Sequence, residues 1–291
     1  MTDAFRVHDL GPYLVEYART DDGTVRLWRW IVVVLVGFVV IGGAAFVVAW
    51  RNSGARQVSF EEAKRRFEAT SSTVAPRPSP LRPPAGVYLY RGSGSEHLDK
   101  PPKSQSQGPS MPATVTFRPD GCWVFRIDYS TGHWQSWTYC ARNGGLDEVG
   151  GQTYERWDFV VFKVDSTSTF TCPSSVTIRR AMLPGDTWTQ TCTGTSSAVK
   201  GVVTTSGPMK YLGTERVTVD GKQVPAYHFK QLRTLTGAQQ GTQDNDVWFA
   251  TSNGMPLRND HHNVVKSDSP IGKVTYTETG TFALTSLQPR S

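Results

Sequence analysis

The sequence predicts a single N-terminal transmembrane helix followed by a mainly-β extracytoplasmic domain. Three observations carry this prediction: a long apolar run near the start, a proline-rich stretch after it, and period-2 alternation of side chains over much of the rest. We expect the β domain to form large, curved antiparallel sheets, half-barrel or barrel-like, stabilised by two hairpin disulfides.

The apolar run extends from Trp30 to Trp50, WIVVVLVGFVVIGGAAFVVAW, and holds 21 residues without a charge. As a helix it spans about 30 Å, the thickness of the hydrocarbon core of a bilayer. Tryptophans at both ends occupy the positions where interfacial aromatic residues are enriched. The run is too long for the apolar part of a signal peptide. We therefore expect an uncleaved transmembrane helix at residues 30–50 and a short cytoplasmic tail at residues 1–29.

Two signals bear on the orientation of this span, and they disagree. More basic residues follow the span than precede it, which by the positive-inside rule favours a cytoplasmic C-terminal domain. All four cysteines also follow the span, and disulfides form in oxidising compartments. Giving more weight to the cysteines, we expect a single-pass protein of the cytoplasmic membrane with its N-terminus inside and its C-terminal domain outside.

Residues 51–85 are expected to hold a stalk helix and a linker. Ser59 and Glu62 form a capping box at the start of SFEEAKRRFEAT, which has one apolar face and one charged face. A solvated stalk is favoured over an interfacial helix lying on lipid headgroups through its basic residues. The stretch PRPSPLRPP at 76–84 is typical of a stiff, extended spacer. The extracytoplasmic domain is therefore expected at residues 86–291.

The cysteines are expected to pair within two hairpin-like units. In GCWVFRIDYSTGHWQSWTYC, a turn centred on Thr131 places Cys122 opposite Cys140, close enough for a cross-strand disulfide. Cys172 and Cys192 have similar spacing around a Pro-Gly-Asp turn. A zinc site would normally show C-x₂₋₄-C pairs, which do not occur here. Buried free thiols are the remaining alternative.

Short alternating segments bounded by turn residues predict the strands of the domain. The expected strands are Val87–Arg91, Thr114–Arg118, Cys122–Asp128, Trp134–Cys140, Arg156–Val164, Thr187–Thr193, Lys200–Thr205, Lys210–Val219, Val224–Leu232, Asp246–Ala250, Leu257–Lys266 and Gly272–Leu284. Asp220-Gly221 and Asn253-Gly254 indicate tight turns. In the last strand, Tyr276 and Phe282 share the packed face with Glu278, and Gly280 permits a bend. The segment from Ser93 to Pro112 has almost no apolar residues and is expected to be a long loop.

Several stretches resemble a family of uncharacterised actinobacterial membrane-anchored or secreted β-rich envelope proteins. These stretches are GVYLYRGSGSEH, the DGCW…YC unit, LPGDTWTQTC, YLGTERVTVDGKQVPAYHF, DVWFATSNGMPLR and SPIGKVTYTETGTFALTSL. This resemblance implies an architecture and a setting at the cell envelope, and no activity. The second half, through W-F-x₄-G-x-P-L, is also similar to lipoprotein-carrier (LolA-like) half-barrels, which shelter lipid on an apolar concave face.

No catalytic signature is present, so we expect no enzyme, no catalytic residue, no cofactor and no metal site. The chain has no G-x-S-x-G, H-E-x-x-H, G-x-G-x-x-G or P-loop sequence. Gly92–His97, GSGSEH, is interpreted as a turn. His261 and His262 are adjacent on an expected strand and therefore point to opposite faces, so only one of them is available to a given site. Half of the net charge of +6 arises before residue 86, near the expected span, and residues 86–291 carry only +3, which excludes a nucleic-acid partner.

Aromatic density is the remaining functional signal, and Trp134, Trp137, Tyr139 and Trp248 are the candidate ligand-lining residues. Filling a core is the more common use of such residues. The sequence predicts a membrane-anchored, non-catalytic envelope protein that binds an apolar or envelope-derived ligand, such as a lipid. The alternative is a structural or interaction subunit that docks on another membrane protein. An enclosed cavity favours the first, and a solid core with an exposed apolar patch favours the second.

Overall fold

The computed structural model describes residues 54–70, 80–160, 162–269 and 272–290. The predicted tail and transmembrane helix, and residues 76–79 of the proline-rich spacer, lie outside these ranges. Within them, no helix has the length and apolar character that a membrane crossing requires. The described residues belong to one compact unit, Ser53–Ser291.

This unit contains one helix and a large antiparallel sheet. Its helix is α2 (Phe60–Thr70). Its strands are β1 (Gly86–Asp99), β2 (Pro102–Gln107), β3 (Ser110–Phe117), β4 (Trp123–Ser130), β5 (His133–Arg142), β6 (Gly145–Asp158), β7 (Lys163–Ser174), β8 (Val176–Ile178), β9 (Thr187–Ser196), β10 (Val202–Val219), β11 (Lys222–Gly237), β12 (Gln239–Ala250), β13 (Pro256–Ser269) and β14 (Gly272–Leu284).

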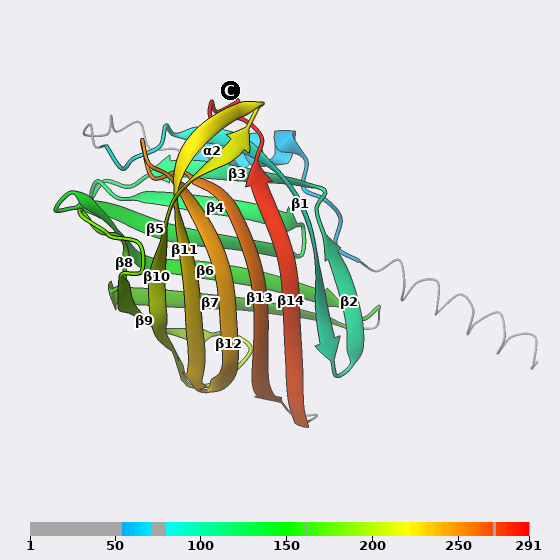
Figure 1. Ribbon diagram of the computed structural model, residues 1–291. Helices are drawn as coiled ribbons and strands as arrows, with labels where there is room; N and C mark the ends of the chain where they lie inside the picture. The colour runs from blue at the N-terminus through cyan, green and yellow to red at the C-terminus, as the bar shows by residue number, and fades with distance from the viewer. Residues whose placement is uncertain (1–53, 71–79, 161, 270–271, 291) are drawn as a thin grey trace, which may run out of the picture. The chain divides into compact units, whose positions relative to one another are not determined.

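The sheet closes on itself. Twelve strands follow one another in the order β14-β13-β12-β11-β10-β9-β7-β6-β5-β4-β3-β1, and β1 pairs with β14 to complete the ring. Strand β2 pairs with the second half of β1, and β8 pairs with β6. Strands β4–β9 cross behind β10–β14, so the ring has two facing walls (Figure 1). The predicted mainly-β, barrel-like architecture is confirmed, with closure in place of a half-barrel.

The hairpin of β4 and β5 has the predicted register. Trp123 lies opposite Tyr139 and Phe125 opposite Trp137, and the pairing shifts by a bulge only after Asp128. Cys122 and Cys140 form a disulfide with their Cα atoms 4.3 Å apart. The predicted second pair is also confirmed.

That second disulfide joins Cys172 on β7 to Cys192 on β9, with Cα atoms 4.1 Å apart. The two strands are neighbours in the ring although β8 lies between them in sequence. The disulfide therefore ties adjacent strands of one wall rather than the two arms of a simple hairpin.

The segment from Ser93 to Pro112 is not a loop. Strand β1 continues to Asp99, β2 follows, and β3 begins at Ser110. The inward side chains of these strands are polar, and among them Glu96, Gln105 and Gln107 are buried. Prediction of a strand from alternation relies on inward apolar side chains, so these strands were missed. The GSGSEH stretch accordingly lies in β1 rather than in a turn.

Two other expected strands differ in extent. Arg156–Val164 is not a strand, because β6 ends at Asp158 and β7 begins at Lys163. The two segments expected on either side of Ser206 are one continuous strand, β10, with a register shift between Tyr211 and Gly213. A bulge lets this strand bend without ending.

Aromatic side chains from distant strands hold the ring together. Tyr90 on β1 contacts Phe125 on β4 and Phe282 on β14 in edge-to-face geometry, with ring centroids 5.6 and 5.5 Å apart. Its hydroxyl donates to the carbonyl oxygen of Pro256 at 2.6 Å. Burying a large aromatic side chain contributes about 1.5–3 kcal/mol, so this cluster stabilises the β14–β1 closure.

Helix α2 begins with the predicted capping box. The Glu62 backbone N–H donates to Ser59 Oγ at 3.2 Å, and the Ser59 backbone N–H donates to Glu62 Oε2 at 2.9 Å. These two bonds satisfy backbone donors that the first turn leaves without intrahelical partners.

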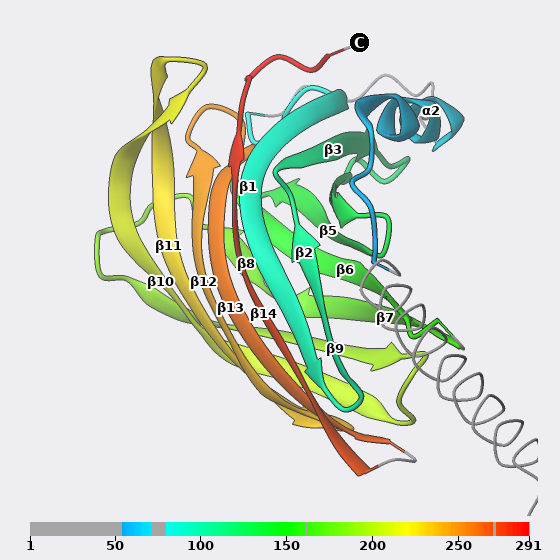
Figure 2. The same ribbon diagram turned by 90° about the vertical axis from the view of Figure 1, so that its right-hand side faces the viewer.

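The helix is not a solvated stalk. Ala63 is fully buried, and Arg66 forms an ion pair at 2.6 Å with Asp128 of β4, which is itself buried. Helix α2 contacts β3 and β1 (Figure 2). The segment assigned to stalk and linker thus contributes packing to the same compact unit as the strands, because its apolar face covers the end of the sheet.

Candidate functional site

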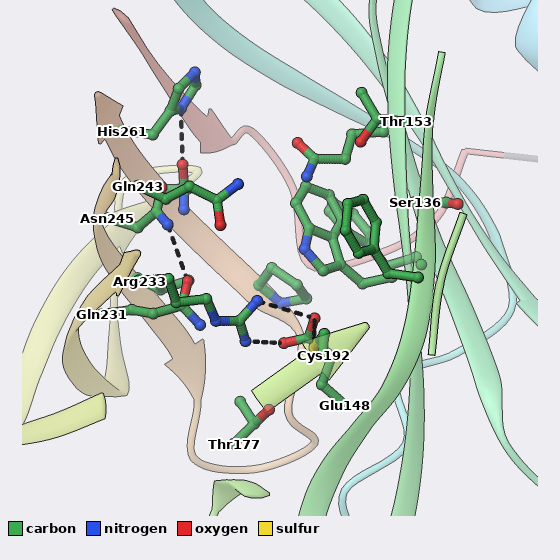
Figure 3. A pocket seen from close by; sticks show the side chains of 18 of the residues that line it. Ser136, Glu148, Thr153, Thr177, Cys192, Gln231, Arg233, Gln243, Asn245 and His261 are labelled. Atoms are coloured by element: carbon green, nitrogen blue, oxygen red, sulfur yellow. Dashed lines mark hydrogen bonds and ion pairs between the residues drawn. The ribbon is translucent and has the colours of Figure 1, made fainter. Parts of the chain in front are cut away.

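A cavity of about 100 Å³ lies inside the closed sheet, between the wall formed by β4–β6 and the wall formed by β10–β13. Figure 3 shows Gln231, Arg233, Gln243, Asn245 and His261 on one side of this space. The residues that line the cavity are Phe125, Tyr129, Gln135, Ser136, Trp137, Tyr139, Glu148, Gly151, Gln152, Thr153, Phe170, Thr177, Cys192, Thr205, Met209, Gln231, Arg233, Gln243, Asn245, Val247, Phe249, Pro256, Asn259, His261, Asn263 and Phe282.

One wall of the cavity is aromatic. Trp137 stacks on Phe125 with ring centroids 5.8 Å apart and an interplanar angle of 24°. Tyr139, two residues further along β5, contacts Phe249 of the opposite wall edge-on at 5.9 Å. Because alternate residues of a strand point to the same face, β5 presents Gln135, Trp137 and Tyr139 together to the cavity.

On the opposite wall, polar and internally hydrogen-bonded side chains lie beside the apolar Val247 and Phe249. Arg233 Nη2 donates to Glu148 Oε2 at 2.8 Å and to Gln190 Oε1 at 3.0 Å. Gln231 Nε2 donates to the same Gln190 oxygen at 2.7 Å, and Asn245 Nδ2 donates to Gln231 Oε1 at 2.9 Å. The chain of contacts runs from β6 through β9 and β11 to β12 and fixes these side chains in place.

The second disulfide supports this network. The sulfur atoms of Cys172 and Cys192 lie 3.8 and 4.0 Å from Glu148 Oε1, and as disulfide sulfurs they carry no proton to donate. The Glu148 backbone N–H donates to the carbonyl oxygen of Ser175 at 2.9 Å. The disulfide therefore limits where the Glu148 carboxylate, and with it Arg233, can move.

Burial raises the pKa of the Tyr139 hydroxyl well above its usual value, with the charge of Glu148 adding to the effect and Arg233 opposing it. The tyrosine at the cavity edge is therefore a neutral hydrogen-bonding group. With Arg233 paired to Glu148, the cavity offers donors and acceptors without an uncompensated charge from this network.

A second buried polar cluster adjoins the cavity through His261. His133 Nδ1 lies 2.7 Å from Glu96 Oε1 and 3.6 Å from Glu278 Oε1. His261 Nε2 lies 3.4 Å from the same Glu278 oxygen. The Gln107 amide nitrogen donates to Glu278 Oε1 at 2.7 Å and to Glu96 Oε1 at 3.0 Å. Strands β1, β2, β5, β13 and β14 each contribute one residue, so only closure of the ring assembles this cluster.

The carboxylates and imidazoles of this cluster shift one another's pKa values. Burial lowers the pKa of His133, but the carboxylates of Glu96 and Glu278 outweigh burial and raise it to about 10. Burial raises the pKa of Glu278, yet the imidazoles of His261 and His133 hold it below its usual value. Burial raises the pKa of Glu155, opposite His133 in the β5–β6 register, to about 7. At neutral pH a protonated His133 therefore compensates the carboxylates.

The structure places two of the four predicted lining residues in the cavity, Trp137 and Tyr139. Trp134 stacks on Tyr154 at 5.9 Å and lies under the Arg126 guanidinium at 3.8 Å. Among the described residues that line the cavity, Trp134 is absent, because its neighbour Gln135 takes the inward position.

Trp248 is also outside the set of described lining residues, since its neighbours Val247 and Phe249 take the inward positions. It stacks on His228 at 4.1 Å and donates its indole N–H to Glu215 Oε2 at 3.0 Å. Its role in the described structure is packing against polar side chains.

Sequence reasoning missed the polar lining, of which Arg233 is the clearest case. Along β11 the inward positions are Phe229, Gln231, Arg233 and Leu235, and Arg233 is only 8% exposed. The intervening Leu232 is 43% exposed. Extending the period-2 pattern of this strand from Phe229 to Leu235 would have predicted that Arg233 is buried. Charged residues are usually assigned to the solvent-facing side of a strand, and this assignment is wrong here.

Comparisons with known proteins add little. No protein-family model matches the chain, and no curated protein matches it. Among solved structures, the chain is similar to the hypothetical lipoprotein YmcC from Escherichia coli K12, with 12% sequence identity and a TM-score of 0.31. The similarity covers 77% of this chain and 97% of that one. Nothing about function follows from a similarity this weak, and the resemblance to actinobacterial envelope proteins stays a prediction.

Proposed function

We propose that this chain is a membrane-anchored, non-catalytic envelope protein whose outer β domain binds a small, neutral, polar ligand derived from the envelope. The observation that carries the proposal is the cavity itself, in which an aromatic wall faces a wall of amides and a paired guanidinium. This lining departs from the purely apolar surface that an acyl chain would require.

The two walls suit a ligand with one apolar face and a hydrogen-bonding rim. A sugar ring has this character, since its C–H face packs on an aromatic ring and its hydroxyl groups pair with amides. Trp137 of β5 supplies the flat surface, and Gln231, Gln243 and Asn245 of β11 and β12 supply donors and acceptors. Sites built to hydrogen-bond a ligand reject analogues that leave their buried polar groups unpaired.

The size of the cavity also favours a small ligand. An engineered protein cavity of about 150 Å³ binds benzene, so the space of about 100 Å³ here admits a small ligand or one end of a larger one. Pockets for drug-sized ligands are typically about 300–1,000 Å³. The lining, rather than the volume, disfavours an acyl chain, because Arg233 and the amides would lose hydrogen-bonding opportunities beside it.

The setting is supported by two independent features. The apolar run at residues 30–50 has the length of a bilayer span. Both disulfides lie in the domain that follows it, and such bonds persist in oxidising compartments. We therefore propose a cytoplasmic-membrane protein with its N-terminus inside and its ligand-binding domain outside.

A second candidate function is docking on another membrane protein, and the turn between β6 and β7 favours it. Phe162 is 50% exposed, and Val160 and Val164 are exposed beside it. Val160 has φ of 68°, which is unusual for a β-branched residue. Exposed apolar side chains grouped at one turn are a common feature of contact sites.

The two candidates are separated by titrating the full chain, purified in mild detergent, with N-acetylglucosamine and with sodium decanoate in a calorimeter. We expect heat from the sugar and none from the decanoate. Gln243→Leu removes one amide from the cavity and should weaken sugar binding about tenfold, since a hydrogen bond contributes about 1.4 kcal/mol.

Gln240→Leu is the matched control, because it is the same substitution on the same strand at an exposed position. It should bind the sugar as the wild type does. Binding of decanoate alone, or equal weakening by both substitutions, would contradict the proposal. The docking function would be favoured by two results together. The chain does not bind the sugar, and a membrane protein that mass spectrometry identifies with the wild type no longer co-purifies with Phe162→Ser.

A further inference from the structure

We propose that Glu96, His133, Glu278 and His261 form a binding site for one divalent transition-metal ion, enclosed by the sheet at the edge of the cavity. The inference is independent of the ligand proposed above, since it concerns different side chains of the same interior. It assigns a role to a buried cluster whose side chains take no part in the proposed sugar binding.

The ligand atoms already stand at coordination spacing. Glu96 Oε1, His133 Nδ1 and a Glu278 oxygen all lie within 4.8 Å of one another. His261 Nε2 lies 3.4 Å from Glu278 Oε1. Around a tetrahedral zinc ion, ligand atoms about 2.1 Å from the metal are about 3.4 Å apart. Small side-chain movements therefore suffice to place four donors around one ion.

Neighbouring amides hold the ligands in this orientation. Gln105 Nε2 donates to Glu96 Oε2 at 2.9 Å, and Asn263 Nδ2 donates to Glu278 Oε2 at 2.9 Å. In each carboxylate the other oxygen, Oε1, is left to face the centre of the cluster. Hydrogen bonds of this kind orient the ligands in metal sites of known proteins.

His261 is oriented in the same way. Its Nδ1 lies 2.9 Å from Asn259 Oδ1, an atom that can only accept, so Nδ1 carries the proton. Nε2 faces Glu278 Oε1 at 3.4 Å, is buried and makes no hydrogen bond. A metal ion between these two atoms would give each of them a coordination bond, with release of any proton on Nε2.

The Gln107 amide nitrogen occupies the place that the ion would take. It lies 2.7 Å from Glu278 Oε1, 3.0 Å from Glu96 Oε1 and 3.3 Å from His133 Nδ1. Its own Oε1 is buried without a hydrogen-bond partner. When an ion binds, the amide can turn so that this oxygen faces the metal, which removes a second buried unsatisfied atom.

Two glycines make room for these side chains. Gly94 and Gly280 lie opposite each other in the β1–β14 register. A Cβ atom at Gly94 would lie 2.4 Å from Gln107 Oε1, and one at Gly280 would lie 2.9 Å from His261 Cε1. The predicted bend at Gly280 thus has a further explanation, since the missing side chain leaves space for the imidazole and the amide.

The donor set selects the class of ion. Imidazole nitrogens with carboxylate oxygens suit Zn²⁺, Co²⁺, Mn²⁺ and Fe²⁺, whereas Ca²⁺ and Mg²⁺ prefer oxygen ligands alone. The other acid and cysteine cluster, Glu148 with Cys172 and Cys192, lacks thiolates because both sulfurs are in a disulfide. His261 lines the cavity, which gives an ion a path to the site.

Equilibrium dialysis of the full chain in detergent against Co²⁺ and Zn²⁺ tests the site, with metal content per chain and the Co²⁺ absorption spectrum as readouts. We expect one ion per chain and a spectrum typical of nitrogen and oxygen ligands. His261→Gln and Glu278→Gln should each weaken binding at least tenfold. His262→Gln is the matched control, because this neighbouring imidazole is exposed and faces away from the cluster.

Circular dichroism and disulfide mapping show whether each variant is folded. If Glu278→Gln does not fold, the test of metal binding uses His261→Gln alone. The inference is overturned if the wild type binds no ion above buffer background. It is equally overturned if His261→Gln binds as tightly as His262→Gln. Sugar binding by the Gln243→Leu variant is measured separately, so failure of the metal site and failure of the ligand proposal are distinguishable.

Discussion

The interior of the closed sheet holds two buried charged clusters that differ in how completely their groups are paired. Around Arg233 and Glu148, the ion pair is bidentate, with distances of 2.8 and 3.4 Å, and Gln190 and Ser175 accept further hydrogen bonds. Around Glu278 and His261, Nε2 and Oε1 lie 3.4 Å apart without a hydrogen bond, and further buried atoms make none.

The difference indicates that buried charged side chains have two roles in this fold, one in ordering the cavity and one in binding an ion. The Arg233 cluster has one cation for one carboxylate and is fixed by the adjacent disulfide, so it orders the polar wall of the cavity. The second cluster has carboxylates and imidazoles converging on a point that a neutral amide fills incompletely. Buried charges are normally paired or bind metal. Arg233 pairs with Glu148 in the first cluster, and in the second, where His133 compensates the carboxylates, we infer metal binding in exchange for protons.

Breaking the Arg233 pair should have the largest effect. Arg233→Met leaves the Glu148 carboxylate buried without its counter-ion, and such losses cost about 3–5 kcal/mol of unfolding free energy. Urea denaturation of the full chain in detergent measures this. The exposed Arg216→Met, on neighbouring strand β10, is the control and should change stability by less than about 0.5 kcal/mol. If both substitutions cost the same, the ion pair has no structural role.

Removing each disulfide in turn distinguishes its effect on the free energy of unfolding from its effect on sugar affinity. The cysteines of the two pairs are 18 and 20 residues apart in sequence, so each bond should stabilise the fold by about 3 kcal/mol. Replacing Cys172 and Cys192 by alanine should also weaken sugar binding, because these sulfurs contact Glu148. Replacing Cys122 and Cys140 should leave sugar affinity near that of the wild type. Equal affinities in the two double variants would break the proposed link between disulfide and cavity.

Loss of the helix contact should have a smaller effect. Arg66→Ala removes one partner of the buried Asp128, but Arg126 still donates to that carboxylate at 3.1 and 2.9 Å. We expect a loss of about 1–2 kcal/mol, measured by the same denaturation, with the exposed Arg65→Ala as the control. A loss as large as that of Arg233→Met would mean that α2 is essential to the closed sheet.

Local chemistry made part of this fold predictable. The register of β4 and β5 and the first disulfide followed from alternation and turn position, because a hairpin is decided by neighbours in sequence. The second disulfide was predicted from hairpin-like spacing, although β8 lies between its two strands in sequence. The packed face of β14 was predicted with Glu278 on it, since Tyr276 and Phe282 share its parity. That buried glutamate, together with His261, which was also considered for a site from the sequence, was the sequence signal of the second cluster.

The rest depended on long-range pairing. Glu96 and Glu278 meet only because β1 pairs with β14, a contact between strands at opposite ends of the domain. The polar interior also led to the prediction of a loop where β2 is a strand. The inward residues of β2 are Lys103, Gln105 and Gln107, which are buried and alternate with small or polar residues. Hydrophobic periodicity carries no signal where the inward side chains are themselves polar.

The most direct test of the contrast between the two clusters is the thermal unfolding midpoint with and without Zn²⁺. At free zinc of about 100 times the dissociation constant, binding contributes about 2.7 kcal/mol, which corresponds to a rise of roughly 5–10 °C. We predict this rise for the wild type and also for Arg233→Met, whose metal cluster is intact. For His261→Gln we predict at most about half of it, because tenfold weaker binding at the same free zinc contributes about 1.4 kcal/mol. An unchanged wild-type midpoint, or the same rise in His261→Gln, would contradict the account.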